Sequence, residues 1–149
     1  AFGVNGGYVT SHACLTRYLR ESAPFYIYSN PITPGEAAAA TTAIKILDSS
    51  EGHARLDHLQ RMKVKFEDGL TGLGLETIPG IHPVTPVMIR DTAKTRQVVE
   101  GLFERGVLAT GLGYPVVPSG DDEIRFQICA DHTPGDIDEA LAALAAALA

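Results

Sequence analysis

The clearest pattern of apolar and polar positions alternates with a period of two near the end of the chain. Over residues 123–130, apolar side chains alternate with more polar ones: Ile124, Phe126 and Ile128 against Arg125, Gln127 and Cys129. Successive side chains of a strand point to opposite faces of a sheet, so this pattern predicts a strand with one buried face. Shorter runs predict further strands over residues 6–11, 25–29, 75–78, 84–89 and 107–110.

A second pattern predicts helices with marked ends. Thr33, Pro34 and Glu36 form a capping box with proline at the first helical position, and Thr133 to Asp136 repeats this signal before the final Ala/Leu helix. The helices are expected over residues 12–22, 34–47, 51–73, from Asp91 to about 106, and from 134 to the end. The helix ending at Leu47 is apolar nearly all round, which predicts that it is buried.

Two of these helices carry an apolar stripe. On the helix over 51–73, which Gly74 should end, the stripe consists of Leu56, Leu59, Phe66, Leu70 and Leu73. On the helix that Asp91 caps, it consists of Val98, Val99, Leu102 and Phe103. Residues 51–149 therefore predict a small α/β domain with helices on a short sheet. Residues 1–50 cannot cover their own apolar faces and are expected to be the end of a larger domain.

Composition narrows the function classes. The 149 residues include 12 basic and 18 acidic ones, a net charge of −6, which argues against general nucleic-acid binding. The basic residues Arg61, Lys63 and Lys65 are expected on a solvated helix face. No run reaches the roughly 18 apolar residues of a membrane span, and the first residues do not resemble a signal peptide. Cys14 and Cys129 are expected to be reduced and buried, in a cytoplasmic protein.

Arg125 is the strongest candidate for chemistry. A guanidinium fixed in the middle of a strand can bind a carboxylate through two parallel hydrogen bonds, although an arginine covering apolar surface is an open alternative. The segment Tyr114 to Pro118 is a stiff loop before that strand, suited to a pocket wall or to a plain connection. His132 lies beside a predicted helix cap and next to this strand. No zinc, P-loop or dinucleotide motif is present; the GLG triplets at Gly72 and Gly111 lack the third glycine.

Four stretches resemble the C-terminal portion of the α-oxoamine synthases, pyridoxal-phosphate (PLP) enzymes of the aspartate-aminotransferase fold. They are AFGVNGGYVTS, FYIYSNPITPGEAAAA, TGLGYPVVPSGDDEIRFQICADHT and the terminal helix. Within the family, the YPVVP loop followed by I-R-x-Q and A-x-H-T most resembles the glycine C-acetyltransferases. The resemblance implies that residues 1–50 end the PLP-binding large domain and that 51–149 form the small domain. It also implies homodimers with shared active sites, acting on glycine and acetyl-CoA.

The resemblance assigns roles to particular residues. The Schiff-base lysine is expected immediately before Ala1, so this chain contains no catalytic residue of its own. Arg125 would hold the substrate carboxylate, and Tyr114 would line the mouth where the acyl group meets the amino acid. Ser29 would reach the cofactor phosphate of the partner subunit, with Asn30 as a weaker candidate. Gly3, Gly6 and Gly7 would let the backbone pass close to the cofactor.

Three other interpretations remain open from the sequence. The chain could belong to another α-oxoamine synthase, such as an 8-amino-7-oxononanoate synthase or a serine palmitoyltransferase, with a different amino acid or a longer acyl chain. It could be an α/β ligand-binding module without catalysis, although residues 1–48 argue against this. It could also be a non-catalytic subunit that keeps the fold and lacks the lysine.

Overall fold

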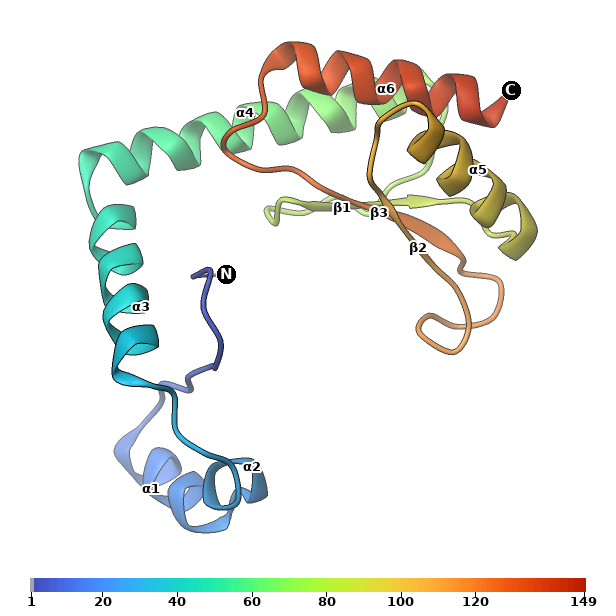
Figure 1. Ribbon diagram of the computed structural model, residues 1–149. Helices are drawn as coiled ribbons and strands as arrows, with labels where there is room; N and C mark the ends of the chain where they lie inside the picture. The colour runs from blue at the N-terminus through green and yellow to red at the C-terminus, as the bar shows by residue number, and fades with distance from the viewer. Residues whose placement is uncertain (1) are drawn as a thin grey trace. The chain divides into compact units, whose positions relative to one another are not determined.

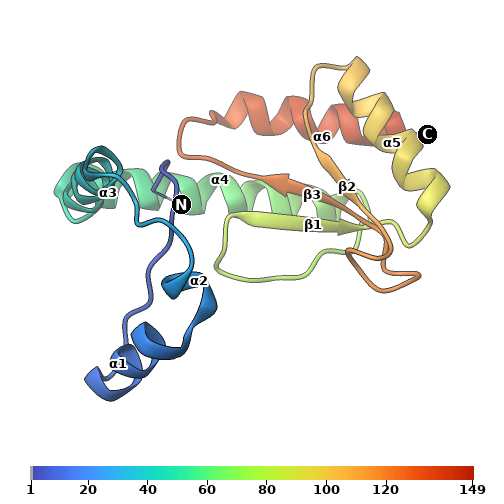
Figure 2. The same ribbon diagram turned by 60° about the horizontal axis from the view of Figure 1, so that its bottom comes forward.

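The computed structural model describes residues 2–149 and divides into two compact units, residues 1–53 and residues 54–149. Each unit is described by itself. Among the described residues, no helix combines the length and apolarity that crossing a membrane requires. Helices and a small antiparallel sheet make up the secondary structure (Figures 1 and 2).

The first unit consists of helices joined by short loops. The Thr33 hydroxyl accepts a hydrogen bond from the Glu36 amide, and the Glu36 carboxylate accepts one from the Thr33 amide, so the predicted capping box is confirmed. No residue of the first three helices is buried, so this unit has no apolar core of its own. The helices of this unit are α1 (Ala13–Ser22), α2 (Pro24–Ile27), α3 (Pro34–Leu47) and the first turn of α4 (Ser50–Gly72).

Two predictions for this unit are wrong. Residues 6–11 form no strand, because no described segment pairs with them. Residues 25–29 contain the end of a short helix rather than a strand, because Pro24 at its first position favours a helical turn. The Ala-rich helix α3 has no buried residue within this chain, so its burial in a larger domain stays a prediction.

The second unit is a three-stranded antiparallel sheet with helices on one face (Figure 1). Its strands are β1 (Val84–Met88), β2 (Thr110–Leu112) and β3 (Glu123–Gln127), in the order β1-β3-β2. Its helices are most of α4, α5 (Thr92–Glu104) and α6 (Pro134–Leu148). The central position of β3 gives it a hydrogen-bonded neighbour on both sides.

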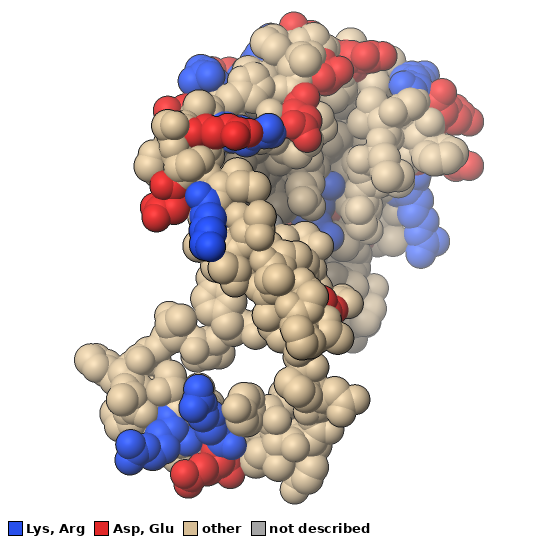
Figure 3. Space-filling model, turned by 60° about the vertical axis from the view of Figure 1, so that its left-hand side comes forward, with Lys and Arg blue, Asp and Glu red and all other residues tan. Residues whose placement is uncertain are grey.

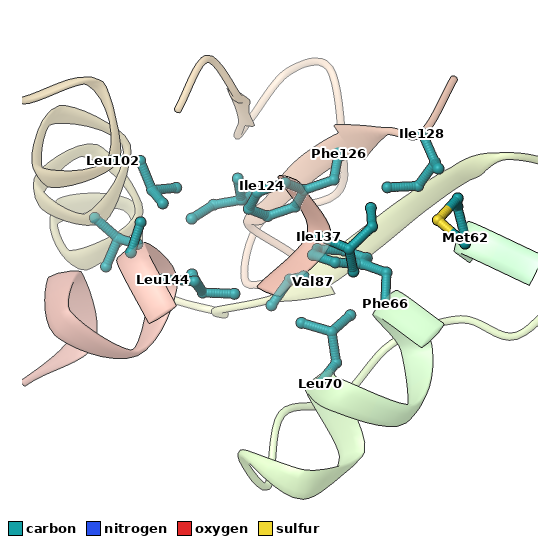
Figure 4. Packing of buried hydrophobic residues seen from close by; sticks show 12 residues of the cluster. Met62, Phe66, Leu70, Val87, Leu102, Ile124, Phe126, Ile128, Ile137 and Leu144 are labelled. Atoms are coloured by element: carbon teal, nitrogen blue, oxygen red, sulfur yellow. The ribbon is translucent and has the colours of Figure 1, made fainter. Parts of the chain in front are cut away.

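The core of this unit lies between the sheet and its helices. The Phe66 ring of α4 packs against the Phe126 ring of β3, with ring centroids 5.0 Å apart. Figure 4 shows side chains from helices and strands converging on this contact. The fully buried members supply most of the apolar stabilisation. The buried cluster is Met62, Phe66, Leu70, Val87, Val98, Leu102, Ile124, Phe126, Ile128, Ile137, Ala143 and Leu144.

The helix and strand predictions for this unit are partly confirmed. The predicted ends at Gly74, Asp91 and Thr133 are correct: Gly74 has φ +70°, Asp91 caps α5, and Thr133 forms the second capping box. The strand expected over 107–110 lies three residues later, and the one expected over 75–78 is a single bridge between Thr77 and Val87.

Several burial predictions are wrong. Leu56, Leu73 and Phe103 are exposed although each was assigned to a buried stripe. Both cysteines are free and exposed, not buried. Lys63, expected on a solvated face, is buried, because the loop before β1 covers it and supplies the Gly80 carbonyl as a hydrogen-bond acceptor.

Candidate functional site

The open face of the sheet carries Arg125 on its central strand. Ile124 and Phe126 are buried under the helices, whereas Arg125 is exposed on the opposite face. Its direct cross-strand neighbours are Pro86 on β1 and Thr110 on β2. Neighbouring side chains on one face of an antiparallel pair lie about 5 Å apart at Cβ, so the Arg125 side chain leaves the sheet between those of Pro86 and Thr110.

The side chain of Arg125 makes no hydrogen bond or ion pair with any residue in the described range 2–149. In contrast, the exposed Arg90 is bound by two carboxylates, Glu76 at 2.7 Å and Asp121 at 3.1 Å. A guanidinium presents five N–H donors in a rigid fork that fits a carboxylate. The five donors of Arg125 are therefore available to an anion.

Tyr114 lies on the other side of β2 from this face. It is exposed and helps to line a cavity of about 510 Å³ between α5 and β2, together with Val99, Phe103 and Asp122. Gly111, which pairs with Ile124 of the buried face, forms part of the same cavity wall. Arg125 is not among the lining residues, so the structure places these two predicted substrate residues on different surfaces of the second unit.

The predicted cofactor residues all lie in the first unit. The Asn5 side chain donates a hydrogen bond to Glu36 at 3.1 Å, and Gly6 lies against Ile32 so closely that any Cβ would overlap its side chain. These contacts bring the N-terminal glycine stretch next to the segment that follows Ser29 and Asn30. Hydrogen bonds from the Thr33 amide and then its hydroxyl, followed by the Asn5 amide, lower the pKa of Glu36 and favour its ionised form.

The three N-terminal glycines differ in whether their backbone conformation and surroundings leave room for a side chain. Gly6 has φ +97°, which L-residues rarely adopt, and no room for a side chain. Gly3 has φ +69° and open space around it. Gly7 has neither a positive φ nor a close neighbour among the described residues. Within this unit, Gly6 is therefore the glycine with the strongest structural requirement.

The polar groups near this stretch suit an anion that only accepts hydrogen bonds. Ser29 is exposed at the end of α2, where its hydroxyl donates to the Phe25 carbonyl and can rotate toward a ligand. The Asn30 side chain is exposed and has no hydrogen bond to any residue in the described part of the chain. These donors fit a phosphate group such as that of PLP, as part of a larger set of contacts.

Sequence reasoning missed the residues whose role follows from pairing and turn geometry. Thr110 was expected to end a strand, and only the register shows that it lies directly opposite Arg125. His58, on α4, was assigned no role, yet its ring lies 2.8 Å from the His132 carbonyl in the turn after β3. No local signal predicts such a contact across 74 residues.

On the surface, charges of both signs are interspersed. Figure 3 shows acidic and basic side chains mixed over the face drawn, with no extended area of one sign.

Comparisons with known proteins place the chain in a family. A profile described as "Aminotransferase class I and II" matches residues 1–144. The 8-amino-7-oxononanoate synthase of Thermosipho melanesiensis is 40% identical over 141 residues, which cover 95% of this chain and 36% of the relative. The mitochondrial 2-amino-3-ketobutyrate coenzyme A ligase of Bos taurus is 32% identical, covering 95% of this chain and 33% of the relative.

A solved structure of a related enzyme has a similar fold. The serine palmitoyltransferase from S. paucimobilis with bound PLP–myriocin superposes with a TM-score of 0.88 at 26% identity, covering 98% of this chain and 37% of that chain. This chain belongs to the aminotransferase class I and II family and has its PLP-dependent transferase fold. Within that family it groups with the α-oxoamine synthases, as the sequence resemblance predicted. PLP is the cofactor of this group, and the chain spans about a third of the length of these relatives.

Proposed function

We propose that this chain is the C-terminal part of a PLP-dependent C-acyltransferase that condenses glycine with acetyl-CoA to give 2-amino-3-ketobutyrate and CoA. The proposal rests above all on Arg125, an exposed arginine in the middle of the central strand with no partner among residues 2–149. An unpaired guanidinium on a rigid strand is suited to holding the carboxylate of an amino acid.

The proposed role of Arg125 is to orient the amino-acid substrate. Two parallel N–H···O bonds to the carboxylate fix both the position and the rotation of a small amino acid. The strand neighbours on both sides limit movement of the Arg125 backbone, so the bound carboxylate stays in one place. Because glycine has no side chain, its carboxylate is the group through which Arg125 could orient it.

PLP, when bound, supplies the electron sink that makes a proton on the amino-acid Cα removable. In this proposal, the first unit contributes contacts to the cofactor phosphate through Ser29 and Asn30. Gly6 lets the backbone pass close to the Ile32 side chain, and Gly3 and Gly7 have open space around them, where a cofactor could approach the backbone. We further propose that the complete enzyme is a homodimer in which Ser29 contacts the cofactor of the partner subunit, and that it acts in the cytoplasm.

A second candidate activity is supported by the relatives. Several 8-amino-7-oxononanoate synthases match this chain at 38–40% identity, compared with 31–32% for two 2-amino-3-ketobutyrate coenzyme A ligases. The loop from Tyr114 to Pro118 and the pattern after Arg125 favour the glycine enzyme instead. The second candidate is thus an 8-amino-7-oxononanoate synthase, which would condense alanine with a longer acyl-CoA. The two candidate enzymes differ in both the amino acid and the acyl-CoA.

Kinetics of the purified full-length protein separate these candidates. Glycine with acetyl-CoA should give faster CoA release than alanine with a longer acyl-CoA or serine with palmitoyl-CoA. Replacing Arg125 with Ala should lower kcat/KM for the amino acid by about 30-fold or more, since losing one partner of a charged hydrogen-bonded pair costs about 2–5 kcal/mol. Arg61→Ala, an exposed arginine on α4, is the matched control and should leave kcat/KM unchanged.

An analogue without a carboxylate sharpens the test. Glycinamide should be a much poorer substrate than glycine for the parent enzyme, and Arg125→Ala should remove most of this preference. Equal loss of both substrates in the variant would contradict carboxylate binding by Arg125. Turnover with alanine and a longer acyl-CoA, but not with glycine, would replace the first candidate by the second.

A further inference from the structure

The turn between β3 and α6 is closed by one side chain. The backbone amide of His132 donates to the Cys129 carbonyl at 3.2 Å, and the Cys129 amide donates to the His132 ring Nδ1 at 3.3 Å. Both polar backbone groups of Cys129 are therefore bound by the same residue. Because Nδ1 accepts a hydrogen bond, it carries no proton in this arrangement, and the ring is neutral.

The same turn is fixed to the helix layer and to the sheet. His58 on α4 donates through Nε2–H to the His132 carbonyl at 2.8 Å, since a carbonyl can only accept. The Ile128 amide donates to the Pro83 carbonyl at 3.0 Å, which extends the pairing of β3 with the chain before β1. Thr133, the next residue, caps α6. His132 thus connects the end of β3 to two helices.

We infer that neutral His132 is a positioning residue for Arg125, acting through the end of β3. The inference rests on the proposed carboxylate-binding role of Arg125. Arg125, Gln127 and Cys129 lie on one side of the extended chain, opposite the buried row that ends at Ile128. The bond from Cys129 to the ring holds the last member of the exposed row. The inferred effect of losing this bond is a looser chain end after Ile128, which would reduce how well the β3 pairing fixes the direction of the Arg125 side chain.

Protonation breaks this bond. A proton on Nδ1 would face the Cys129 N–H, placing two donors against each other. The charged and titratable groups around the ring are Asp136 on α6, Asp131 and Cys129 in the turn, and His58 and Arg55 on α4. The Asp136 carboxylate already accepts hydrogen bonds from the Thr133 amide and hydroxyl. None of these groups replaces the ring as an acceptor for the Cys129 amide in the part of the chain that the structure describes.

The test uses two substitutions in the full-length, PLP-loaded protein. In His132→Asn, the side-chain Oδ1 stands where Nδ1 stood and accepts the same bond, but it does not titrate. In His132→Ala the acceptor is lost at every pH. When the pH is lowered from about 8 far enough to protonate the ring, KM for glycine should rise for the parent protein about three- to tenfold more than for His132→Asn. For His132→Ala, KM for glycine should exceed that of the parent protein at both high and low pH, while kcat changes little.

A spectroscopic readout is independent of turnover. In 15N-labelled protein at neutral pH, His132 should show an unprotonated Nδ1, and His58 should show a protonated Nε2. His53→Asn, an exposed position on α4, is the control and should follow the parent pH profile. A protonated Nδ1 on neutral His132, or the same KM profile for His132→Asn and the parent, would overturn the inference.

The outcomes also separate this inference from the proposed function. If Arg125→Ala leaves KM for glycine unchanged, the carboxylate role of Arg125 fails. If Arg125→Ala raises KM but His132→Asn and His132→Ala both behave like the parent, only the positioning role of His132 fails.

Discussion

The buried ion pair on α4 gives a quantitative prediction. The Lys63 side chain is 3% exposed, and its Nζ donates to Glu67 Oε2 at 2.7 Å and to the Gly80 carbonyl. The other Glu67 oxygen, Oε1, is buried and has no partner among the described residues. Replacing Lys63 with Met keeps the apolar stem and removes the charge, which leaves the partly buried Glu67 carboxylate without the cation that it contacts among residues 2–149.

Breaking a buried pair from one side costs about 3–5 kcal/mol. Glu67 is 19% exposed, so the cost of Lys63→Met should lie near the lower limit, at about 3 kcal/mol. Replacing both residues with Met removes the stranded charge. What remains is the Gly80 carbonyl without its donor, at about 1 kcal/mol. The double variant should therefore be about 2 kcal/mol more stable than the single variant.

Urea unfolding followed by circular dichroism measures both differences, and Lys65→Met, on the partly exposed side of the same helix, is the control. Hydrogen exchange of residues 74–83 should also speed up in Lys63→Met, because the loop loses its anchor. Two results would refute this reasoning: a decrease of less than about 1 kcal/mol in the free energy of unfolding for Lys63→Met, or a double variant less stable than the single one. Either would mean that Lys63 is not needed to compensate the charge of Glu67.

Three further predictions follow from local geometry. Hydrogen bonds from the Thr133 amide and hydroxyl lower the pKa of Asp136, so their stabilisation should be present at neutral pH and fade as the pH falls through that pKa; melting curves of Asp136→Asn and the parent should differ at pH 7 and converge in acid. Arg90 has φ +60°, so Arg90→Gly should melt at a higher temperature than Arg90→Ala, although both lose the same ion pairs; equal melting temperatures would contradict a strained backbone. Gly6→Ala should displace Ile32 and weaken PLP binding, measured by absorbance titration; unchanged PLP binding would contradict the close contact at this position.

Local signals were enough to predict the features that depend on neighbouring residues. The period of two placed Arg125 on the face opposite Ile124, because burial on one side of a sheet imposes that alternation. The capping boxes at Thr33 and Thr133 were predicted correctly, because a cap depends on residues three positions apart. The family was identified from the same short stretches.

Features that depend on distant residues could not be predicted. The apolar run from Val107 led to a strand three residues too early, because pairing with β3 decides where β2 lies, and Leu108 is 86% exposed. Lys63 has a charged side chain on a helix, and only the loop before β1 explains its burial. The neighbour of Arg125 across the sheet, Thr110, is known from the register alone.

The strand order has a consequence for how substrate preference can change. Among residues 2–149, Arg125 belongs to the central strand, which is paired along both edges, whereas Thr110 belongs to an edge strand and Pro86 to a strand whose outer edge carries only the bridge between Thr77 and Val87. Exchanges on the two outer strands can reshape the surroundings of a bound carboxylate while the anchor keeps its position. A scaffold of this kind can adopt new amino acids by small steps, without rebuilding the group that recognises what all of them share.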